Sequence, residues 1–463
     1  MIAETRIYRK EKTRLKELKF FVVTDTHFFK NSLGAYGADY ETYMDTQQKC
    51  FAETEAINRA VFDDLAGRSD ADIVLIAGDL TFNGEKESHA AFCEMLHDFE
   101  KKSGKKVYVV TAGHDVNAAP YGFNDSGRVT VEGTTFGELY DFYKDFGYDG
   151  AIAFNRAHLS YVTELSEDVR LLVICNDVEG EKHIAYPDDF LSWIAEQAQK
   201  AQADGKMMIA MEHYPVLAGQ PLLSLIGDAR QAQSRKLIDT LADNGVHLIF
   251  TGHMHNQSVN VAHSAKGNVL YDVCTGCTIG CPAFMRLVTV KDEHTVEIES
   301  IPTPDFDWDK KGMTGKEYLK VQFDRMIRTF VDSMEEDPER FLGKVHMKNT
   351  PAMQKLFHAL GKRLRRMRVG TVARLLCVRA EPQVKDVKFT DFAIDLVRVV
   401  FEGNQPFVEG TPEGDTLLRI FRRLSPFFKK MKDAQGEPVD FYEMMKHTVG
   451  NYGLDDYNTT LTF

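Results

Sequence analysis

Long apolar runs are missing from this chain. No stretch approaches the ~20 apolar residues that a bilayer-spanning helix needs, although 43% of the 463 residues are hydrophobic. The first twenty residues are rich in charge and lack the apolar segment of a signal peptide. Cysteine is also scarce, and its seven scattered residues are typical of a reducing compartment. We therefore expect a cytoplasmic protein with no membrane partner.

Positive charge is in short supply. The 56 Lys and Arg residues are outnumbered by 69 Asp and Glu residues, which gives a net charge of -13. Such a chain repels a polyanion overall, so we expect no nucleic-acid polymer as a partner. Basic helices are predicted around 362–368 and 419–432. We favour solvated faces for them, with lipid or nucleic-acid binding and a lid over a binding site as open alternatives.

The chain divides into two parts by pattern. Up to about residue 303, short apolar runs alternate with amphipathic stretches, which predicts an α/β fold. The runs predicted as strands are 18–25, 71–79, 106–113, 169–177, 207–213, 246–253, 268–276 and a hairpin over 285–300. The stretches predicted as helices between them are 47–68, 85–102, 188–202 and 231–245, with Gly245 as a C-terminal cap. After about residue 303 strand-like runs largely disappear and amphipathic stretches follow, which predicts an all-helical C-terminal domain. The predicted domains are therefore 1–303 and 304–463.

Aspartates and histidines follow most of these strands at the point where each strand ends. Asp25 and His27 are two residues apart, so an extended chain points both to the same side. The later strands end in Asp79, in His114 and Asp115, in His213, and in the pair His253 and His255. Ligands of α/β sheets bind in the crevice at the carboxyl ends of the strands. Each short motif is weak alone, but together they predict a metal site.

The residue types narrow the choice of metal. Imidazole and carboxylate without clear thiolate ligands suit Zn, Fe or Mn better than Ca. The candidates outnumber the ligands that one open catalytic ion needs, which favours two divalent ions sharing a carboxylate. The cysteines of 274–282 are interpreted as small thiols in a loop that borders the site. A zinc or redox role for that loop is the alternative.

These motifs resemble the calcineurin-like metallophosphoesterase superfamily. The matching segments, in order, are DTH (25–27), GDLTFNGE (78–85), AGHD (112–115), MEHYP (211–215) and GHMH (252–255). The resemblance covers roughly residues 15–300. It implies two facing mixed β-sheets flanked by helices, with the site at the sheet edges.

The resemblance also implies a role for each residue. Asp25, His27 and His255 would hold the first ion, Asp79 would bridge both, and His213 and His253 would hold the second. His114 would contact the phosphate or protonate the leaving group, and Asp115 would orient His114. A hydroxide between the ions would attack phosphorus.

One position departs from the family pattern. The family places Gly-Asn before His-Asp, and this chain has Ala112 and Gly113 there. The Asn would give a side-chain oxygen to the second ion, so that ligand is absent. Water, Asn83 or Asn117 are the possible substitutes, although both asparagines fit better as loop-stabilising residues. We expect the second ion to bind weakly.

The sequence therefore predicts a phosphoric ester hydrolase for a small phosphoester. The GDLTFNGE segment resembles the cyclic-nucleotide phosphodiesterase-like branch, which favours a diester over a monoester. The alternative is a catalytically weakened relative that binds phosphate or metal without turnover. The His114–Asp115 pair counts against it, because a pure binder has little use for a positioned acid. The oligomeric state is left open.

Overall fold

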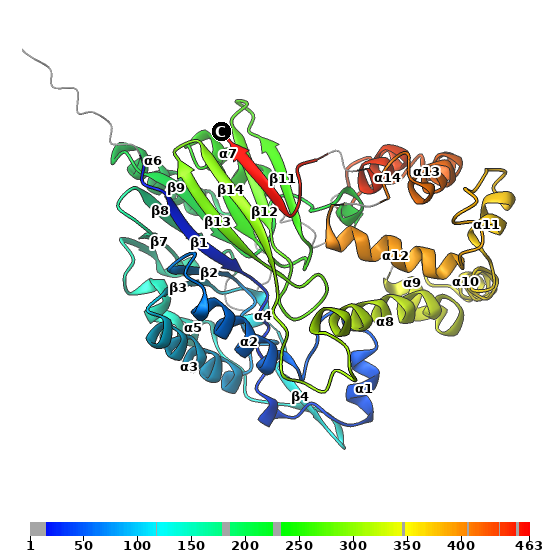
Figure 1. Ribbon diagram of the computed structural model, residues 1–463, viewed down its shortest axis with the longest axis horizontal. Coiled ribbons are helices and arrows are strands. Elements are labelled where there is room, and N and C mark those ends of the chain that lie inside the picture. Colours follow the sequence, from blue (N-terminus) through cyan, green and yellow to red (C-terminus); the bar gives the residue numbers. More distant parts are fainter. Residues whose placement is uncertain are drawn as a thin grey trace, which may run out of the picture.

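The computed structural model describes residues 15–116, 118–177, 186–225, 233–344, 348–404, 407–434, 436–450 and 453–463. Two mixed β-sheets face each other, helices cover their outer sides, and a lobe of helices extends to one side (Figure 1). This arrangement confirms the predicted fold.

The first sheet has the strand order β15-β14-β13-β1-β2-β3. Its central strands β1, β2 and β3 are parallel, whereas β13 is antiparallel to β1. The bounds are β1 Leu18–Val23, β2 Ile73–Ala77, β3 Lys106–Val110, β13 Phe284–Asp292, β14 Thr295–Pro302 and β15 Asn458–Thr462. Because β1 to β3 run in parallel, their carboxyl ends meet at one edge of the sheet.

The second sheet has the order β11-β12-β10-β9-β8-β7-β6, with β8, β9, β10 and β12 parallel. Its bounds are β6 Ala153–Asn155, β7 Ser160–Glu164, β8 Val169–Ile174, β9 Met207–Glu212, β10 Leu248–Thr251, β11 Ser258–His263 and β12 Val269–Cys274. A separate hairpin consists of β4 (Tyr121–Asn124) and β5 (Gly127–Thr130). Parallel strands in this sheet also deliver their ends to one edge.

The main core lies between the sheets. The rings of Phe20 on β1 and Phe250 on β10 meet edge to face with centroids 5.5 Å apart, and both are fully buried. The outer face of the first sheet packs on α2 (Thr54–Gly67) and α3 (Lys86–Ser103). The outer face of the second sheet packs on α6 (Asp188–Ala203) and α7 (Ser234–Asp243). Gly245 follows α7 with a φ of 76°, as its predicted cap position requires.

The helical lobe follows β14. Its helices are α8 Gly315–Glu336, α9 Pro338–Lys344, α10 Pro351–Leu364, α11 Val369–Leu375, α12 Phe389–Glu402, α13 Pro412–Leu424 and α14 Phe441–Val449. The remaining helices are α1 Ala38–Met44, α4 Gly113–Val116 and α5 Phe136–Tyr143. The helix expected through residue 432 ends at Leu424, because Pro426 cannot continue it.

The sequence analysis missed β15, with which the chain returns from the helices to the first sheet (Figure 1). Arg286 on β13 anchors this return. It is fully buried, and its guanidinium donates to the carbonyl oxygens of Cys274 (2.7 Å) and Asp456 (2.9 Å). The division into 1–303 and 304–463 stays a prediction, since the last strand of the second part completes the first.

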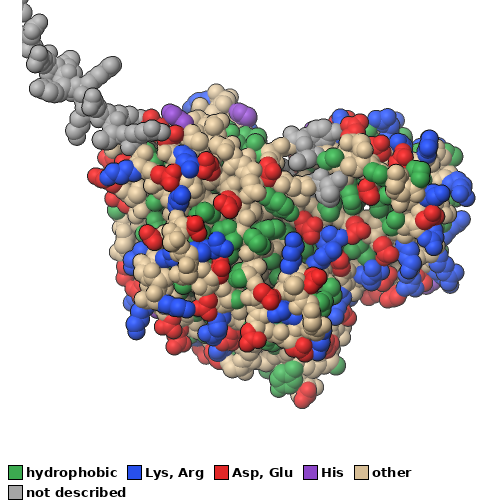
Figure 2. All heavy atoms as spheres, in the orientation of Figure 1, with side chains coloured by type: hydrophobic (Ala, Val, Ile, Leu, Met, Phe, Trp, Pro, Cys, Tyr) green, Lys and Arg blue, Asp and Glu red, His purple; other side chains and the backbone are tan. Residues whose placement is uncertain are grey.

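Charges of both signs are interspersed on the helical lobe (Figure 2). Arg365, from the basic stretch 362–368, lies 2.8 Å from Glu335 and 3.0 Å from Glu336. Arg419, from the second basic stretch, pairs with Glu381 at 2.6 Å. These pairs agree with solvated faces. In the described part of the chain, no helix combines the length and apolarity needed to cross a bilayer.

Candidate metal centre

The ends of β1 and β2 stay paired beyond the strands. The backbone N–H of Asp25 donates to the Gly78 carbonyl (3.1 Å), and that of His27 donates to the Asp79 carbonyl (2.9 Å). This pairing carries the Asp-x-His and Gly-Asp segments to the same place. From the second sheet, the Gly252 N–H donates to the His213 carbonyl at 2.8 Å, which joins the loops after β9 and β10.

The backbone at this edge is unusual. Left-handed φ values, rare for residues other than glycine, occur at Asp25 (52°), His27 (36°), Asp79 (50°), His253 (66°) and His255 (49°). Such conformations cost of order 1–3 kcal/mol each and cluster at functional sites. Five of the six residues predicted to hold metal share this feature, which supports a functional role for the edge.

Asp25, His27 and His255 form the first ligand group. The Nε2 atoms of His27 and His255 are 3.1 Å apart, and His255 Nε2 lies 3.1 Å from Asp25 Oδ1. His27 Nε2 is 3.7 Å from both Asp25 Oδ1 and Asp79 Oδ2. Ligand atoms about 2.1 Å from one ion are separated by about 3 to 3.5 Å, so these spacings fit a common ion.

Asp79, His213 and His253 form the second group, and its potential ligand atoms lie within 4.8 Å of one another. His213 Nε2 is 3.1 Å from Asp79 Oδ2 and 4.0 Å from Asp25 Oδ1. Asp79 Oδ2 therefore lies between the histidines of both groups, as a bridging carboxylate would. The structure brings together all six predicted metal residues, and their individual roles stay predictions.

Each carboxylate is held through its other oxygen. Asp25 Oδ2 accepts hydrogen bonds from Thr24 Oγ1 (2.6 Å) and the backbone N–H of His253 (3.0 Å). Asp79 Oδ1 accepts from the backbone N–H of His114 at 3.0 Å. These bonds fix the carboxylates and leave Asp25 Oδ1 and Asp79 Oδ2 facing the histidines.

Two glycines make the close packing possible. A Cβ on Gly78 would lie 2.6 Å from His213 Nδ1, and one on Gly252 would overlap the Thr24 hydroxyl. Gly78 also has a φ of 87°. Both the Gly-Asp and Gly-His pairs therefore need glycine for close approach, and the Gly-Asp pair also needs it for its conformation.

The donor set fits divalent ions. Asp25 Oδ1 and His213 Nε2 are buried, and among the described residues their near polar neighbours are other candidate ligand atoms, an arrangement that is costly unless a further group binds there. His213 Nδ1 donates to the Ala77 carbonyl at 2.8 Å, and this contact leaves Nε2 as the ligand atom.

The electrostatics agree with that fit. Burial alone lowers the pKa of His213, but the charges of Asp79 and Asp25 outweigh it and raise that pKa to about 9. Burial opposes the ionisation of Asp25, yet the neighbouring histidines hold its pKa well below the usual range. The ionised carboxylates thus attract cations, either protons or metal ions.

His114 is the second residue of α4. Its Nδ1 lies 2.6 Å from the Phe82 carbonyl, which can only accept, so Nδ1 carries the proton. Its ring lies beside His27, with centroids 4.8 Å apart. This leaves Nε2 as the ring nitrogen that can meet a phosphate or a leaving group.

The expectation that Asp115 orients His114 needs correction. Asp115 Oδ1 accepts from the Thr81 N–H at 2.9 Å, and Oδ2 accepts from the Ala112 N–H at 2.8 Å. The Phe82 carbonyl performs the orienting contact instead. Asp115 therefore braces both the loop that carries Phe82 and the start of the segment that carries His114.

Gly113 occupies the position of the family's Asn, and its contacts show what surrounds that position. Its N–H donates to the Tyr214 hydroxyl (3.2 Å), and that hydroxyl is 3.0 and 3.1 Å from the two oxygens of Asp177. Asn83 Oδ1 lies 3.2 Å from His114 Nδ1, which makes it a supporting residue, as expected. Asn117 lies outside the described residues.

Two neighbours of the site were missed as functional residues. Lys49 Nζ is 3.2 Å from both ring nitrogens of His27, and burial lowers the pKa of this lysine to about 8. Cys277 lies close enough to His255 to help raise the pKa of that histidine, so the cysteine loop borders the site as predicted. No spacing pattern marks Lys49 in the sequence, because its loop before α2 reaches the site only in the fold.

The helical lobe supports the Gly-His-x-His loop. Met254, between the two histidines, packs with Val400 of α12, and the Gln257 N–H donates to the Phe401 carbonyl at 2.9 Å. On the other side, Gln322 of α8 donates to the carbonyls of Met44 (2.6 Å) and Gln47 (3.0 Å), close to Lys49 in sequence. The lobe thus holds two loops of the metal centre.

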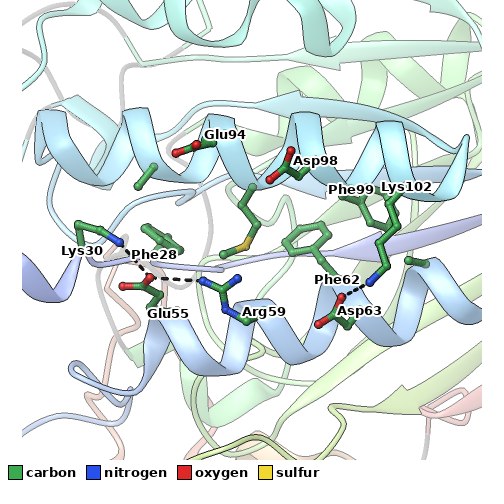
Figure 3. A pocket seen from close by; sticks show the side chains of 13 residues that line it. Phe28, Lys30, Glu55, Arg59, Phe62, Asp63, Glu94, Asp98, Phe99 and Lys102 are labelled. Carbon is green, nitrogen blue, oxygen red and sulfur yellow. Dashed lines mark hydrogen bonds and ion pairs between the residues drawn. The ribbon is translucent and has the colours of Figure 1, made fainter.

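A separate groove of about 310 Å³ lies between α2 and α3 (Figure 3). Its cations already have partners: Lys30 lies 3.0 Å from Glu55, Arg59 lies 3.5 Å from Glu55, and Lys102 lies 2.6 Å from Asp63. None of the six metal residues lines this groove. Its contacts give it no part in the chemistry of the metal centre.

Comparison with known proteins assigns the class. Residues 18–257 match the family described as calcineurin-like phosphoesterase, so the chain belongs to this family. A comparison with curated protein sequences gave no match.

Solved structures show distant similarity. A dimetal phosphatase from Danio rerio is 11% identical, with 62% of this chain and 96% of that chain covered and a TM-score of 0.44. Purple acid phosphatase PPD1 from yellow lupin is 15% identical, with 63% and 52% covered and a TM-score of 0.40. A putative 5'-nucleotidase from Staphylococcus aureus is 12% identical, with 67% and 58% covered and a TM-score of 0.37. At TM-scores below 0.5, these similarities add no weight to the family assignment.

Proposed function

We propose that this chain hydrolyses a phosphate ester of a small molecule at a pair of divalent ions. The observation that carries the proposal is the pair of candidate ligand groups meeting at Asp79, with buried ligand atoms that face one another. Bound ions would supply Lewis acidity, which lowers the pKa of water and neutralises charge on the phosphoryl group. Mn, Fe and Zn suit the donors.

The side chains divide the remaining work. Asp25 and Asp79 would provide the negative charge that holds the ions. Hydrogen bonds to Asp25 Oδ2 and Asp79 Oδ1 keep the two carboxylates in place. His114 presents Nε2, since its Nδ1 is occupied by the Phe82 carbonyl. That nitrogen would contact a phosphoryl oxygen or pass a proton to the departing alcohol.

Metal content and ester hydrolysis test the proposal together. Purified protein saturated with Mn should contain about two ions per chain by mass spectrometry, as a two-ion site requires. It should hydrolyse p-nitrophenyl phosphate or bis(p-nitrophenyl) phosphate. Protein that binds no ion and hydrolyses neither ester would refute the function.

A non-catalytic role is the second candidate, and Gly113 is the observation that favours it. The position offers no side-chain ligand to the second ion. If that role is correct, the loaded protein should bind inorganic phosphate but release no p-nitrophenol from either ester.

Replacing His114 tests its contact with the leaving group. We expect His114→Asn to lower kcat on an alkyl phosphate by about 10²- to 10⁴-fold, the usual range for general acid catalysis. The loss on p-nitrophenyl phosphate should be much smaller, because p-nitrophenolate departs without a proton. Initial rates on both esters at equal metal content measure the difference.

The matched control is His247→Asn. His247 has the same kind of contact, with Nδ1 2.7 Å from the Val269 carbonyl, but belongs to neither ligand group. It should lose little activity on either ester. An equal loss on both esters in His114→Asn would contradict a role in protonating the leaving group.

A further inference from the structure

Lys49 is a buried lysine in the loop between α1 and α2. Lys49 is only 8% exposed. The loop is fixed by pairing with the cysteine loop: Lys49 forms a β-bridge with Gly280, and the Cys50 N–H donates to the Ile279 carbonyl at 2.9 Å. The side chain therefore enters the metal centre from a braced backbone.

The Lys49 ammonium has no carboxylate within ion-pair distance among the described residues. Its contacts are the two ring nitrogens of His27, each at 3.2 Å, and the face of Phe82, with Nζ 4.6 Å from the ring centroid. A buried charge is costly unless an opposite charge or hydrogen bonds compensate it. These contacts compensate an ammonium only in part, and the carboxylates of Asp79 and Asp25 act on it from beyond ion-pair distance.

Metal binding increases this need for an anion. His27 Nε2 belongs to the first ligand group, so an ion there would place a second positive charge beside the ammonium. The anion that completes the environment must therefore lie near both the first ion and Lys49. The substrate phosphoryl group is the anion that the site is built to receive.

The position of His114 agrees with this assignment. His27 is flanked by His114, whose ring centroid is 4.8 Å away, and by the Lys49 ammonium. A phosphoryl group beside His27 could therefore meet both side chains. The two residues reach this place from separate loops, after β3 and before α2.

We propose that Lys49 binds a phosphoryl oxygen of the substrate and thereby selects dianionic phosphate, that is, a phosphomonoester over a diester. This inference rests on the proposed function of the same site. A monoester carries about 1.5 to 2 negative charges near pH 7, as other singly esterified phosphates do. A diester carries one negative charge, so an additional cation benefits the monoester more. The inference departs from the diester expectation drawn from the GDLTFNGE segment.

Phosphate binding is the direct test. Titration of Mn-loaded protein with inorganic phosphate should show Lys49→Met binding about ten- to a hundredfold more weakly than the wild type, as expected for losing a hydrogen bond to a charged group. Lys49→Arg should retain most of the affinity. Metal content should be unchanged in both variants.

Lys105→Met is the matched control. Lys105 is equally buried, at 4% exposure, but its ammonium donates to the carbonyls of Arg68 (2.8 Å) and Ala71 (2.5 Å). This variant should unfold at a lower temperature and keep the phosphate affinity of the wild type. It separates loss of a buried lysine from loss of a lysine at the metal centre.

Ester preference supplies the second readout. Lys49→Met should lose at least about tenfold more kcat/KM on p-nitrophenyl phosphate than on bis(p-nitrophenyl) phosphate, the difference expected for one charge-assisted contact. Unchanged phosphate affinity, or equal losses on the two esters, would overturn the inference and leave the hydrolase assignment intact. Wild-type protein that binds no ion and hydrolyses neither ester would remove both.

Discussion

Asp79→Asn should abolish most of the activity while leaving the fold intact. Asp79 Oδ2 lies 3.1 Å from His213 Nε2 and 3.7 Å from His27 Nε2, so its charge serves both ligand groups. The amide keeps an oxygen for the His114 N–H but removes the charge that holds two cations together. We expect kcat/KM to fall about a thousandfold, at the upper end of losses seen when one electrostatic contact is removed. Mass spectrometry should show fewer than two ions per chain.

Asp456→Asn is the control for losing a buried carboxylate. Asp456 accepts from the backbone N–H groups of Val259 and Asn404, each at 2.9 Å, and belongs to neither ligand group. This variant should be less stable to heat and retain both ions. If Asp79→Asn kept two ions and full activity, Asp79 could not be the bridging ligand.

The sequence predicted that the six candidate metal residues meet at one place, and this was possible because each motif is local. Asp25 and His27 follow a strand directly, as do His253 and His255, and parallel strands bring such ends to one edge. The predicted sheets and the helices that cover them rest on the same periodic patterns. What the motifs could not show is the left-handed backbone at five of the six candidate metal residues.

The missed features depend on long-range contacts. Lys49 and Cys277 come from loops that meet at the Lys49–Gly280 bridge, more than two hundred residues apart in sequence. The role of Asp115 toward His114 came from the family resemblance, yet its carboxylate accepts from the Thr81 N–H after β2 and from the Ala112 N–H. β15 was missed because five residues separated from their partner strand carry little pattern of their own.

The helical lobe changes how the site should be understood. Its α12 packs on Met254 between two metal residues, and its α8 binds carbonyls a few residues before Lys49. The lobe is therefore part of the support for the metal centre. Changes within α8 or α12 can reach the chemistry by moving the loops of Lys49 and His253.

Gly113→Asn should raise the affinity of the protein for the second ion. The neighbouring N–H of His114 donates to Asp79 at 3.0 Å, and the Gly113 N–H donates to Tyr214, the residue that follows His213. Position 113 therefore lies next to the residue whose N–H binds Asp79, a member of the second ligand group. Because Gly113 is the first residue of α4, its helical backbone accepts asparagine without the strain of a left-handed conformation.

The expected gain is about ten- to a hundredfold in affinity for the second ion, the size of effect that single residues around metal sites commonly have. Turnover should rise with occupancy at limiting Mn. A metal titration that resolves the two ions, with initial rates at each concentration, measures both effects. Gly113→Ala adds the Cβ without the amide, so it should show neither gain.

Tyr214 is the residue whose hydroxyl contacts the backbone at position 113, so it bears on the outcome of this substitution. Its hydroxyl already lies against Gly113 and Asp177, in the region that an asparagine side chain would enter. If Gly113→Asn changed neither affinity nor rate, the second ion would not be short of a ligand in the native protein. The expectation that the second ion binds weakly would then be wrong. Groups other than the side chain at position 113 would complete its coordination. A gain confined to Gly113→Asn would instead show that the absent amide limits the native protein.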